Sequence, residues 1–185
     1  SLKRNLFMSM VLREELSEGI VAITLNRPES LNALSPALFS ELNQIVTELS
    51  KQTDSVGCVI LRGAGRCFSA GNDLKAVRSG VKAKEKFFQA KTIDLIEKLP
   101  QPTIASVHGH CLTGALELAI ACDLMITSES ANLADTHGKW GMVPGWGMSV
   151  RLPRRVGLLK AKEMMFTDLK AVRSGVKAKE KFFQA

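Results

Sequence analysis

The chain has 185 residues, of which 45% are hydrophobic, and its formal net charge is +7 at pH 7. This length and apolar content suffice for one globular domain with a substantial core, and no apolar run approaches the roughly 20 residues that cross a bilayer. The four cysteines show no Cys-x-x-Cys spacing and there are three histidines, so the composition argues against a disulfide framework or a zinc site and favours a reducing compartment.

Strand and helix patterns alternate along the chain. Residues 20–25 are β-branched and apolar and predict a strand. Ser35-Pro36 then provides an N-cap and a first-turn proline before apolar residues at helical spacing up to Leu49. Such alternation is typical of an α/β fold with crossover connections. The later elements are expected as strands at 56–62, 103–107 and 124–127, a helix over 73–99 with a break near Ser79-Gly80, and a short helix that opens near Gly114.

A glycine-bearing turn follows the strand expected at 56–62. Gly63-Ala64-Gly65 leads into Phe68-Ser69-Ala70-Gly71-Asn72-Asp73-Leu74. A strand that ends in such a turn leaves backbone N–H groups free in a concavity, where they can hold an oxygen that gains negative charge. The Ala-Gly-Asn-Asp sequence is also an ordinary turn. This segment alone therefore leaves two interpretations open, an oxyanion-binding loop and a simple turn.

A second glycine-bearing turn follows the strand expected at 103–107. The helix that opens near Gly114 has unpaired N–H groups and a positive dipole at its first turn. Glu117 is the one charged residue within 115–122, and a buried carboxylate is costly without a partner or a purpose. It is either an acid/base beside a polarised carbonyl oxygen or an acidic residue favoured by the helix dipole.

Together with a third motif, these two stretches resemble the enoyl-CoA hydratase/isomerase (crotonase) superfamily, over residues 10–167. The resemblance implies an α/β fold of the crotonase-like (ClpP/crotonase) type, a spiral of strand–strand–helix units. Family members continue past the position of Thr167 into further helices, so a C-terminal helical region is expected to be missing here. The matching motifs are Asn26-Arg27-Pro28 with Leu31-Asn32-Ala33-Leu34, the loop at 69–74, and the turn and helix at 114–123.

The resemblance implies an acyl-CoA enzyme that stabilises a thioester enolate. It would be an enoyl-CoA hydratase, which adds water to a 2-enoyl-CoA, or an enoyl-CoA isomerase. The N–H groups of Asn72 and Gly114 would form the oxyanion hole, with Glu117 as the acid/base. Coenzyme A would be part of the substrate, with no permanently bound cofactor and no metal. The residues implied to line the adenine and pantetheine path are Ser30, Leu31, Ala33, Ala70, Asp73, Leu74 and Lys75.

The sequence departs from the family pattern at His137. Family hydratases carry two glutamates that share a water molecule, and counting from Glu117 without a gap puts His137 at the second position. A histidine can hold or deprotonate water because its pKa lies near neutrality, so His137 is a candidate catalytic residue. The alternative is a loop histidine with Asp135 as its local partner. The nearby glycine- and tryptophan-rich stretch 140–147 suits an acyl-pocket wall or plain packing.

Two other functions remain open. The first is an acyl-CoA decarboxylase or thioesterase of the same fold, which His137 motivates. The second is a non-catalytic RNA-binding module, but the first amphipathic helix shows Glu41 and Glu48 with only Lys51 at its end, and lacks interleaved aromatic residues. We therefore expect neither a nucleic-acid nor a membrane partner. By the resemblance, the protein would be a homotrimer or a dimer of trimers when the C-terminal region is present. It would serve fatty acid metabolism in the cytoplasm or in a mitochondrial or peroxisomal matrix.

The two ends of the chain differ from the core domain, which we place at residues 11–167. Residues 1–10 are short and basic, and we interpret them as a tag or the remnant of a targeting segment. Residues 168–185 repeat residues 73–90 letter for letter. Solenoid repeats occur as several drifted copies in tandem. We therefore interpret the second copy as an artefact of the expressed gene or of sequence assembly, with a real duplicated basic helix as the alternative.

Overall fold

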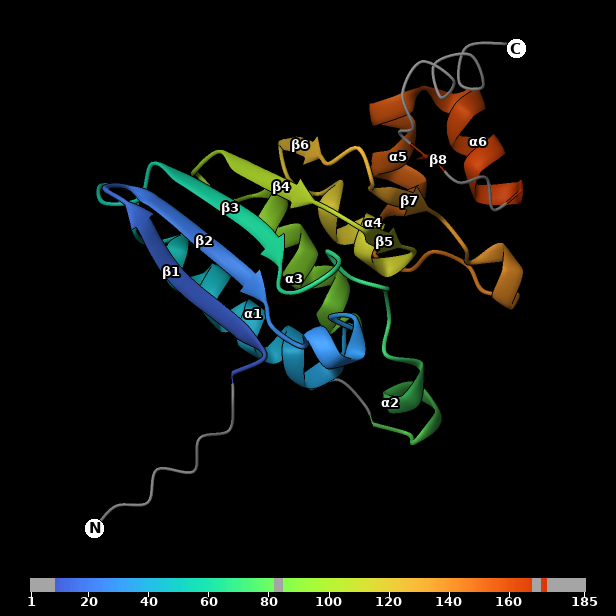
Figure 1. Ribbon diagram of the computed structural model, residues 1–185, viewed down its shortest axis with the longest axis horizontal. Helices are drawn as coiled ribbons and strands as arrows, with labels where there is room; N and C mark the ends of the chain where they lie inside the picture. Colours follow the sequence, from blue (N-terminus) through green and yellow to red (C-terminus); the bar gives the residue numbers. More distant parts are fainter. Residues whose placement is uncertain (1–8, 82–84, 168–170, 173–185) are drawn as a thin grey trace.

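A five-stranded sheet forms the centre of the computed structural model, which describes residues 9–81, 85–167 and 171–172 (Figure 1). β1 pairs antiparallel with β2, and the remaining neighbours pair in parallel. Parallel neighbours need crossover connections, so the α/β class predicted from the alternating pattern is confirmed. The strands, in their order across the sheet, are β1 (Val11–Ser17), β2 (Ile20–Leu25), β3 (Cys58–Gly63), β4 (Thr103–Val107) and β6 (Leu124–Thr127).

A smaller sheet lies between the main strands and the helices that follow them. β4 is followed by β5 (His110–Leu112) and α4 (Gly114–Ala119). β6 is followed by β7 (Asn132–Ala134), the 3-10 turn η2 (Gly138–Trp140) and α5 (Met148–Val156). β5 and β7 pair in parallel, and β8 (Ala171–Val172) pairs antiparallel with β7. The strand–strand–helix repeat that the sequence predicts is therefore present.

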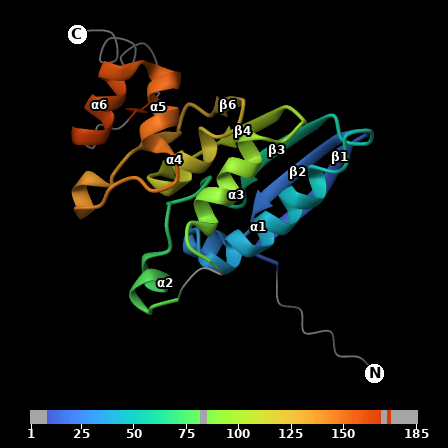
Figure 2. The ribbon, with the colours of Figure 1, turned by 180° about the vertical axis from the view of Figure 1, so that it is seen from behind.

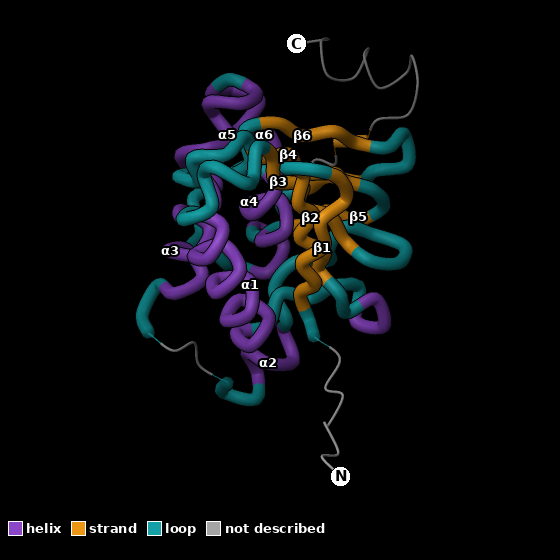
Figure 3. The backbone as a smooth tube through the Cα atoms, turned by 90° about the vertical axis from the view of Figure 1, so that its left-hand side faces the viewer, coloured by secondary structure: helices purple, strands orange, loops and turns teal. Residues whose placement is uncertain are grey.

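Helices cover one face of the main sheet (Figure 3). Seen from behind, α1 (Pro36–Leu49) and α3 (Phe88–Glu97) lie across β2, β3 and β4 (Figure 2). α1 begins as predicted, because the Ser35 side chain accepts a hydrogen bond of 3.2 Å from the N–H of Leu38. Its apolar side is buried against the sheet. The largest fully buried side chains of this core include Leu25, Leu38, Phe39, Leu42, Phe68 and Ile93.

The break expected near Ser79-Gly80 in the helix over 73–99 is confirmed, but the break is longer than expected and extends to Phe87. The helix is divided into α2 (Leu74–Arg78) and α3, and the described residues between them are not helical. Gly80 and Phe87 have φ values of 73° and 62°, which a right-handed helix cannot accommodate. Five further elements were not predicted from the sequence: β1, β5, β7, α5 and α6 (Leu158–Thr167). Strands of three residues such as β5 and β7 are too short to show a periodic pattern.

The repeated segment lies outside the described residues in its second copy, except at Ala171 and Val172. These two residues form β8, whereas their counterparts Ala76 and Val77 lie in α2. Propensity is a weak preference that tertiary context overrides, so the same dipeptide occurs as strand and as helix. Residues 1–8 also lie outside the described residues. The assignments made for the two ends of the chain stay predictions.

Asn32 organises the loop between β2 and α1. It is fully buried, and its side-chain amide donates to three carbonyl oxygens within 64–68 at 2.8, 2.9 and 3.1 Å. Its Oδ1 accepts a hydrogen bond of 2.8 Å from the N–H of Arg27, and its carbonyl accepts one of 2.8 Å from the Ser69 hydroxyl. The backbone of Asn32 has a φ of 53°, a conformation that Asn tolerates better than most residues. One side chain therefore joins the loops that follow β2 and β3.

We expect Asn32→Asp to lower the free energy of unfolding by about 3 kcal/mol or more. The carboxylate would have nearly the same shape but would face three carbonyl oxygens without a donor. Asn32→Gly loses the same hydrogen bonds but accepts a positive φ, so it should be more stable than Asn32→Ala by about 1 kcal/mol. Urea denaturation of the three variants measures both differences. Wild-type stability in Asn32→Asp would contradict the role given to this side chain.

Candidate functional site

Two turns lie side by side where β3 and β4 end. Ser69 and Cys111 form a parallel bridge, and Asn72 and Gly114 each follow their bridged residue by three positions. Gly71 approaches the second turn so closely that a Cβ would lie 2.6 Å from the carbonyl oxygen of Leu112. Its φ of 97° also favours glycine. The bridge and this close approach therefore bring the loop that contains Asn72 beside the turn that precedes Gly114.

The backbone N–H groups of Asn72 and Gly114 are not used by the fold. Neither donates a hydrogen bond within the described part of the chain, whereas the N–H groups of Gly71, Asp73 and Thr113 all do. Gly114 is also the first residue of α4, where the helix dipole is positive. Two unused donors in adjacent turns are suited to an oxygen that gains negative charge.

Thr113 holds a strained backbone conformation just before α4. Its φ of 55° and ψ of −112° are rarely adopted by a β-branched residue, so surrounding contacts must stabilise them. The Thr113 N–H donates to the carbonyl of Ala134 at 2.8 Å, and its hydroxyl oxygen lies 2.5 Å from that of Thr136. Both partners belong to the segment in which β7 ends. These contacts bring Asp135 and His137 beside α4.

Glu117 is buried within α4, and its side chain is 1% exposed. Its Oε1 accepts hydrogen bonds from the N–H groups of Trp146 at 2.7 Å and Met148 at 3.0 Å. Its Oε2 lies 3.7 Å from Nε2 of His137. One carboxylate oxygen is therefore held by the loop before α5, while the other faces the imidazole. The burial expected from the apolar neighbours is confirmed.

The environment of Glu117 makes its proton harder to lose than usual. Burial raises the pKa of the carboxyl, and the N–H groups of Met148 and Trp146 together with His137 lower it by less, while Asp135 adds to the rise. A raised pKa makes the protonated form of this carboxyl easier to keep, which suits a group that both accepts and donates a proton.

His137 pairs with Asp135 in the turn after β7. Its Nδ1 lies 2.6 Å from Oδ1 of Asp135, and that oxygen also accepts a hydrogen bond of 3.0 Å from the His137 N–H. A carboxylate oxygen can only accept, so we assign the ring proton to Nδ1, which leaves Nε2 toward Glu117. Asp135 is fully buried, and its Oδ2 has no partner among the described residues. The local partner expected for His137 is present, and the same imidazole also reaches the acid/base candidate.

Arg151 holds the loop that binds Glu117, and no sequence pattern singles it out. Its buried guanidinium donates to Asp94 and Glu97 of α3, both at 2.6 Å, and to the carbonyl of Trp146 at 2.8 Å. The two acidic partners are 57 and 54 residues away in sequence. Arg151 therefore fixes the backbone of Trp146 from one side while Glu117 holds it from the other.

The residues expected to line the coenzyme A path lie on two adjacent loops, after β2 and after β3. The N–H of Ala70 donates to the carbonyl of Leu31 at 2.9 Å, and the N–H of Leu34 to the carbonyl of Gly71 at 2.8 Å. The structure therefore brings these residues together, on the side of Asn72. Among the expected lining residues, Lys75 is exposed, Asp73 is buried, and Ser30, Leu31, Ala33, Ala70 and Leu74 are half-buried.

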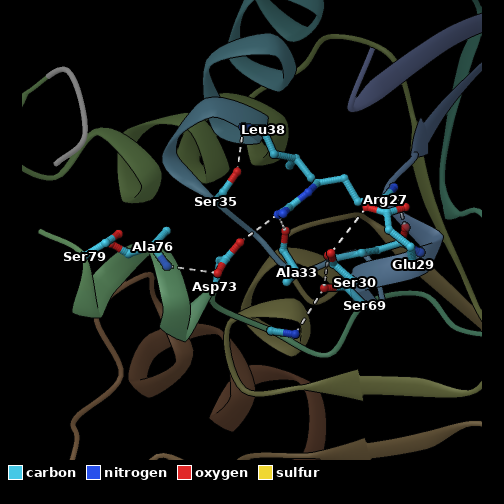
Figure 4. A network of polar contacts seen from close by, with 12 residues as sticks. Arg27, Glu29, Ser30, Ala33, Ser35, Leu38, Ser69, Asp73, Ala76 and Ser79 are labelled. Atoms are coloured by element: carbon cyan, nitrogen blue, oxygen red, sulfur yellow. Dashed lines mark hydrogen bonds and ion pairs between the residues drawn. The ribbon is translucent and has the colours of Figure 1, made fainter. Parts of the chain in front are cut away.

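Asp73 connects the two loops through Arg27 (Figure 4). Nη1 of Arg27 donates to Oδ2 of Asp73 at 2.8 Å and to the carbonyl of Ala33 at 2.7 Å. The other carboxylate oxygen of Asp73 accepts a hydrogen bond of 3.1 Å from Ala76 and so caps α2. Burial alone would raise the pKa of Asp73, but the hydrogen bonds from Arg27 and Ala76 outweigh it and hold the pKa below its usual value. Its carboxylate therefore stabilises the loops as an anion.

The cysteines are free thiols, as expected, and Cys67, Cys111 and Cys122 are buried. Burial raises the pKa of Cys111 and raises that of Cys122 to about 12, so neither is a reactive thiolate. Within residues 9–81 and 85–167, no His, Cys, Asp and Glu side chains gather into a group that could hold a metal. In the same part of the chain, no helix combines the length and apolarity needed to cross a bilayer.

Residues 15–174 match the sequence family described as enoyl-CoA hydratase/isomerase. The chain is 38% identical over 153 residues to the Arabidopsis thaliana protein named probable enoyl-CoA hydratase 1, peroxisomal, covering 83% of this chain and 57% of the relative. It is 38% identical over 158 residues to the mitochondrial methylglutaconyl-CoA hydratase of Mus musculus, covering 83% and 50%. The crystal structure of an enoyl-CoA hydratase from Bacillus anthracis matches with a TM-score of 0.81 at 35% identity, over 94% of this chain and 67% of that one. The chain therefore spans about half the length of these two curated relatives.

Proposed function

The chain belongs to the enoyl-CoA hydratase/isomerase family and has its crotonase-like fold, and from this premise we propose that the protein is an acyl-CoA enzyme, an enoyl-CoA hydratase or isomerase. The observation that carries the proposal is the pair of unused N–H donors on Asn72 and Gly114, with the buried carboxylate of Glu117 one turn along α4.

The oxyanion hole would stabilise the charge that develops on the thioester carbonyl oxygen. When water adds to the β-carbon, or when an α-proton is removed, electron density moves onto that oxygen. Fixed donors at Asn72 and Gly114 would then bind the transition state more strongly than the ground state. Losing one such donor typically costs about 3–4 kcal/mol of barrier.

Glu117 would transfer the proton, since a carbonyl oxygen pinned at Gly114 places the α- and β-carbons near its carboxylate. In isomerisation, Glu117 alone would take a proton from the α-carbon and return it to the γ-carbon. In hydration, a water beside Oε2 of Glu117 and Nε2 of His137, which lie 3.7 Å apart, would contact both groups. The water oxygen would bond to the β-carbon, and one water proton would pass to Nε2 of His137. The α-carbon would receive a proton from the carboxyl group of Glu117.

The coenzyme A part of the substrate would lie along the two loops joined by Arg27 and Asp73, with Ser30, Leu31, Ala33 and Ala70 near the adenine and pantetheine. Leu74 and Lys75 continue this path on α2. We further propose that the protein assembles as a homotrimer or a dimer of trimers. A mitochondrial or peroxisomal location is supported by relatives whose names give those compartments.

Crotonyl-CoA provides the test of this proposal. We expect the full chain to remove the absorbance of the conjugated thioester as water adds. A 3-enoyl-CoA should instead gain that absorbance if isomerisation is the main reaction. Release of free thiol, followed with a thiol reagent, would identify a thioesterase, the alternative that a water-activating His137 leaves open. Loss of conjugation without thiol release supports the hydratase, and inertness toward both enoyl thioesters would refute the proposal.

A further inference from the structure

The indole ring of Trp146 occupies the space between the start of α4 and α1. A Cβ built on Gly114 would lie 2.4 Å from Cζ3 and 2.9 Å from Cε3 of this ring. The ring also meets Phe39 of α1 edge to face, with the centroids 5.0 Å apart and an interplanar angle of 73°. Phe39 is fully buried. The ring therefore lies directly on the glycine whose N–H points toward the proposed oxyanion.

The main chain on both sides of this ring is held in place. The Trp146 N–H donates to Glu117 at 2.7 Å, and its carbonyl accepts from Arg151 at 2.8 Å. The edge-to-face contact with Phe39 adds a third point of attachment, of a kind worth about 0.5–1.5 kcal/mol beyond area burial. The two hydrogen bonds fix the main chain of Trp146, and rotation of the indole would break its contact with Phe39.

The position of the indole ring would affect the length of the acyl group that can bind. A carbonyl oxygen bound at Gly114 would lie about 3 Å from that N–H, and the reacting carbons would lie next to Glu117. Trp146 touches both residues, since its ring lies on Gly114 and its N–H bonds to Glu117. The indole is therefore a large side chain that lies beside both the proposed oxyanion donor and the proposed acid/base.

We propose that Trp146 limits the acyl length that this site accepts, so that short acyl groups such as crotonyl are preferred over long ones. This inference rests on the proposed acyl-CoA function and names its substrate class. A single methylene that does not fit a pocket changes specificity by about 10- to 200-fold, so a fixed ring can discriminate strongly along a series of chain lengths.

Trp140 provides a matched control. It is the other tryptophan of the chain, it lies in the same segment on η2, and it is 55% exposed. Trp140→Ala removes an indole of the same size, and its ring makes no aromatic contact of the kind that Trp146 makes with Phe39 in the described part of the chain.

The experiment compares the full chain with Trp146→Ala, Trp146→Phe and Trp140→Ala on 2-enoyl thioesters from crotonyl-CoA to 2-decenoyl-CoA. We expect wild-type kcat/KM to fall by about 100-fold or more across the series. Trp146→Ala should reduce that fall to about tenfold or less, Trp146→Phe should lie between, and Trp140→Ala should match wild type. An unchanged length dependence in Trp146→Ala would overturn the inference.

Binding separates this inference from the proposed reaction. Calorimetry with butyryl-CoA and decanoyl-CoA measures length preference without turnover. If no enoyl thioester reacts but Trp146→Ala gains affinity for decanoyl-CoA relative to butyryl-CoA, the length limit stands and the proposed reaction fails. Equal preference in wild type and Trp146→Ala refutes the length limit whether or not turnover occurs. Thermal melting checks that each variant is folded, and if Trp146→Ala is not, the Trp146→Phe comparison decides by the same criterion.

Discussion

Replacing Glu117 by glutamine should lower turnover by roughly two to four orders of magnitude and leave thioester binding nearly intact. The glutamine oxygen can still accept the two hydrogen bonds that Glu117 receives from Trp146 and Met148 at 2.7 and 3.0 Å. Its amide nitrogen would replace the oxygen that faces His137, and an amide cannot transfer the proton. The loop before α5 should therefore keep its place while the chemistry stops.

Initial rates and calorimetric binding of a saturated acyl-CoA measure the two halves of this expectation. Glu48→Gln is the matched control, since Glu48 is an exposed carboxylate on α1. A Glu117→Gln variant with full rate would show that this carboxylate is structural. Loss of binding together with loss of rate would show that the loop had moved.

The same variant should change how stability depends on pH. Burial raises the folded-state pKa of Glu117, so the folded protein holds this proton more tightly than the unfolded chain. Stability therefore falls as pH rises from the ordinary carboxyl range to the raised pKa, and the full cost of the buried charge is present above it. Asp135 and His137 also act on the carboxyl of Glu117. The Tm of Glu117→Gln is therefore compared with the Tm of wild type at each pH. We expect the Tm of Glu117→Gln to exceed that of wild type near neutral pH and the excess to disappear in acid. An excess that does not change with pH would contradict this account.

Replacing His137 by alanine should abolish hydration while exchange of the substrate α-proton survives. Exchange requires only the oxyanion donors and Glu117, whereas addition of water also requires a group that holds the water. Nε2 of His137 faces Oε2 of Glu117 at 3.7 Å because Asp135 engages Nδ1 at 2.6 Å. The imidazole is therefore placed where it can hold a water against the carboxylate.

Hydration and solvent deuterium uptake are measured on the same His137→Ala preparation. His110→Ala serves as a control, because His110 is exposed on β5. Equal and modest losses of both activities would mean that His137 only braces the loop through Asp135. In that case Glu117 would be the only acid/base of the site.

Local signals in the sequence were sufficient for much of the fold. The strand at 20–25 has the same bounds in the structure, and α1 begins at the Ser35-Pro36 signal. The strands expected at 103–107 and 124–127 also keep their bounds. Apolar periodicity and helix capping involve residues that are close in sequence, so both can be recognised in the amino-acid sequence alone. The break near Ser79-Gly80 was also predicted, whereas its extension to Phe87 was not, because the positive φ of Phe87 is not revealed by any periodic pattern.

The sequence by itself determined the α/β class, the order of the motifs and, through them, the family that the match over residues 15–174 confirms. It also placed Glu117 among buried residues. Only the tertiary structure decided what surrounds that carboxylate. Trp146 lies 29 residues from Glu117, and Arg151 lies 57 from Asp94. Such contacts depend on how crossovers bring distant turns to the same end of a sheet, and no short-range pattern encodes them. The indole on Gly114 and the approach of His137 to Glu117 therefore become visible only in the folded chain, whereas Asp135 is close enough in sequence to be expected as a partner of His137.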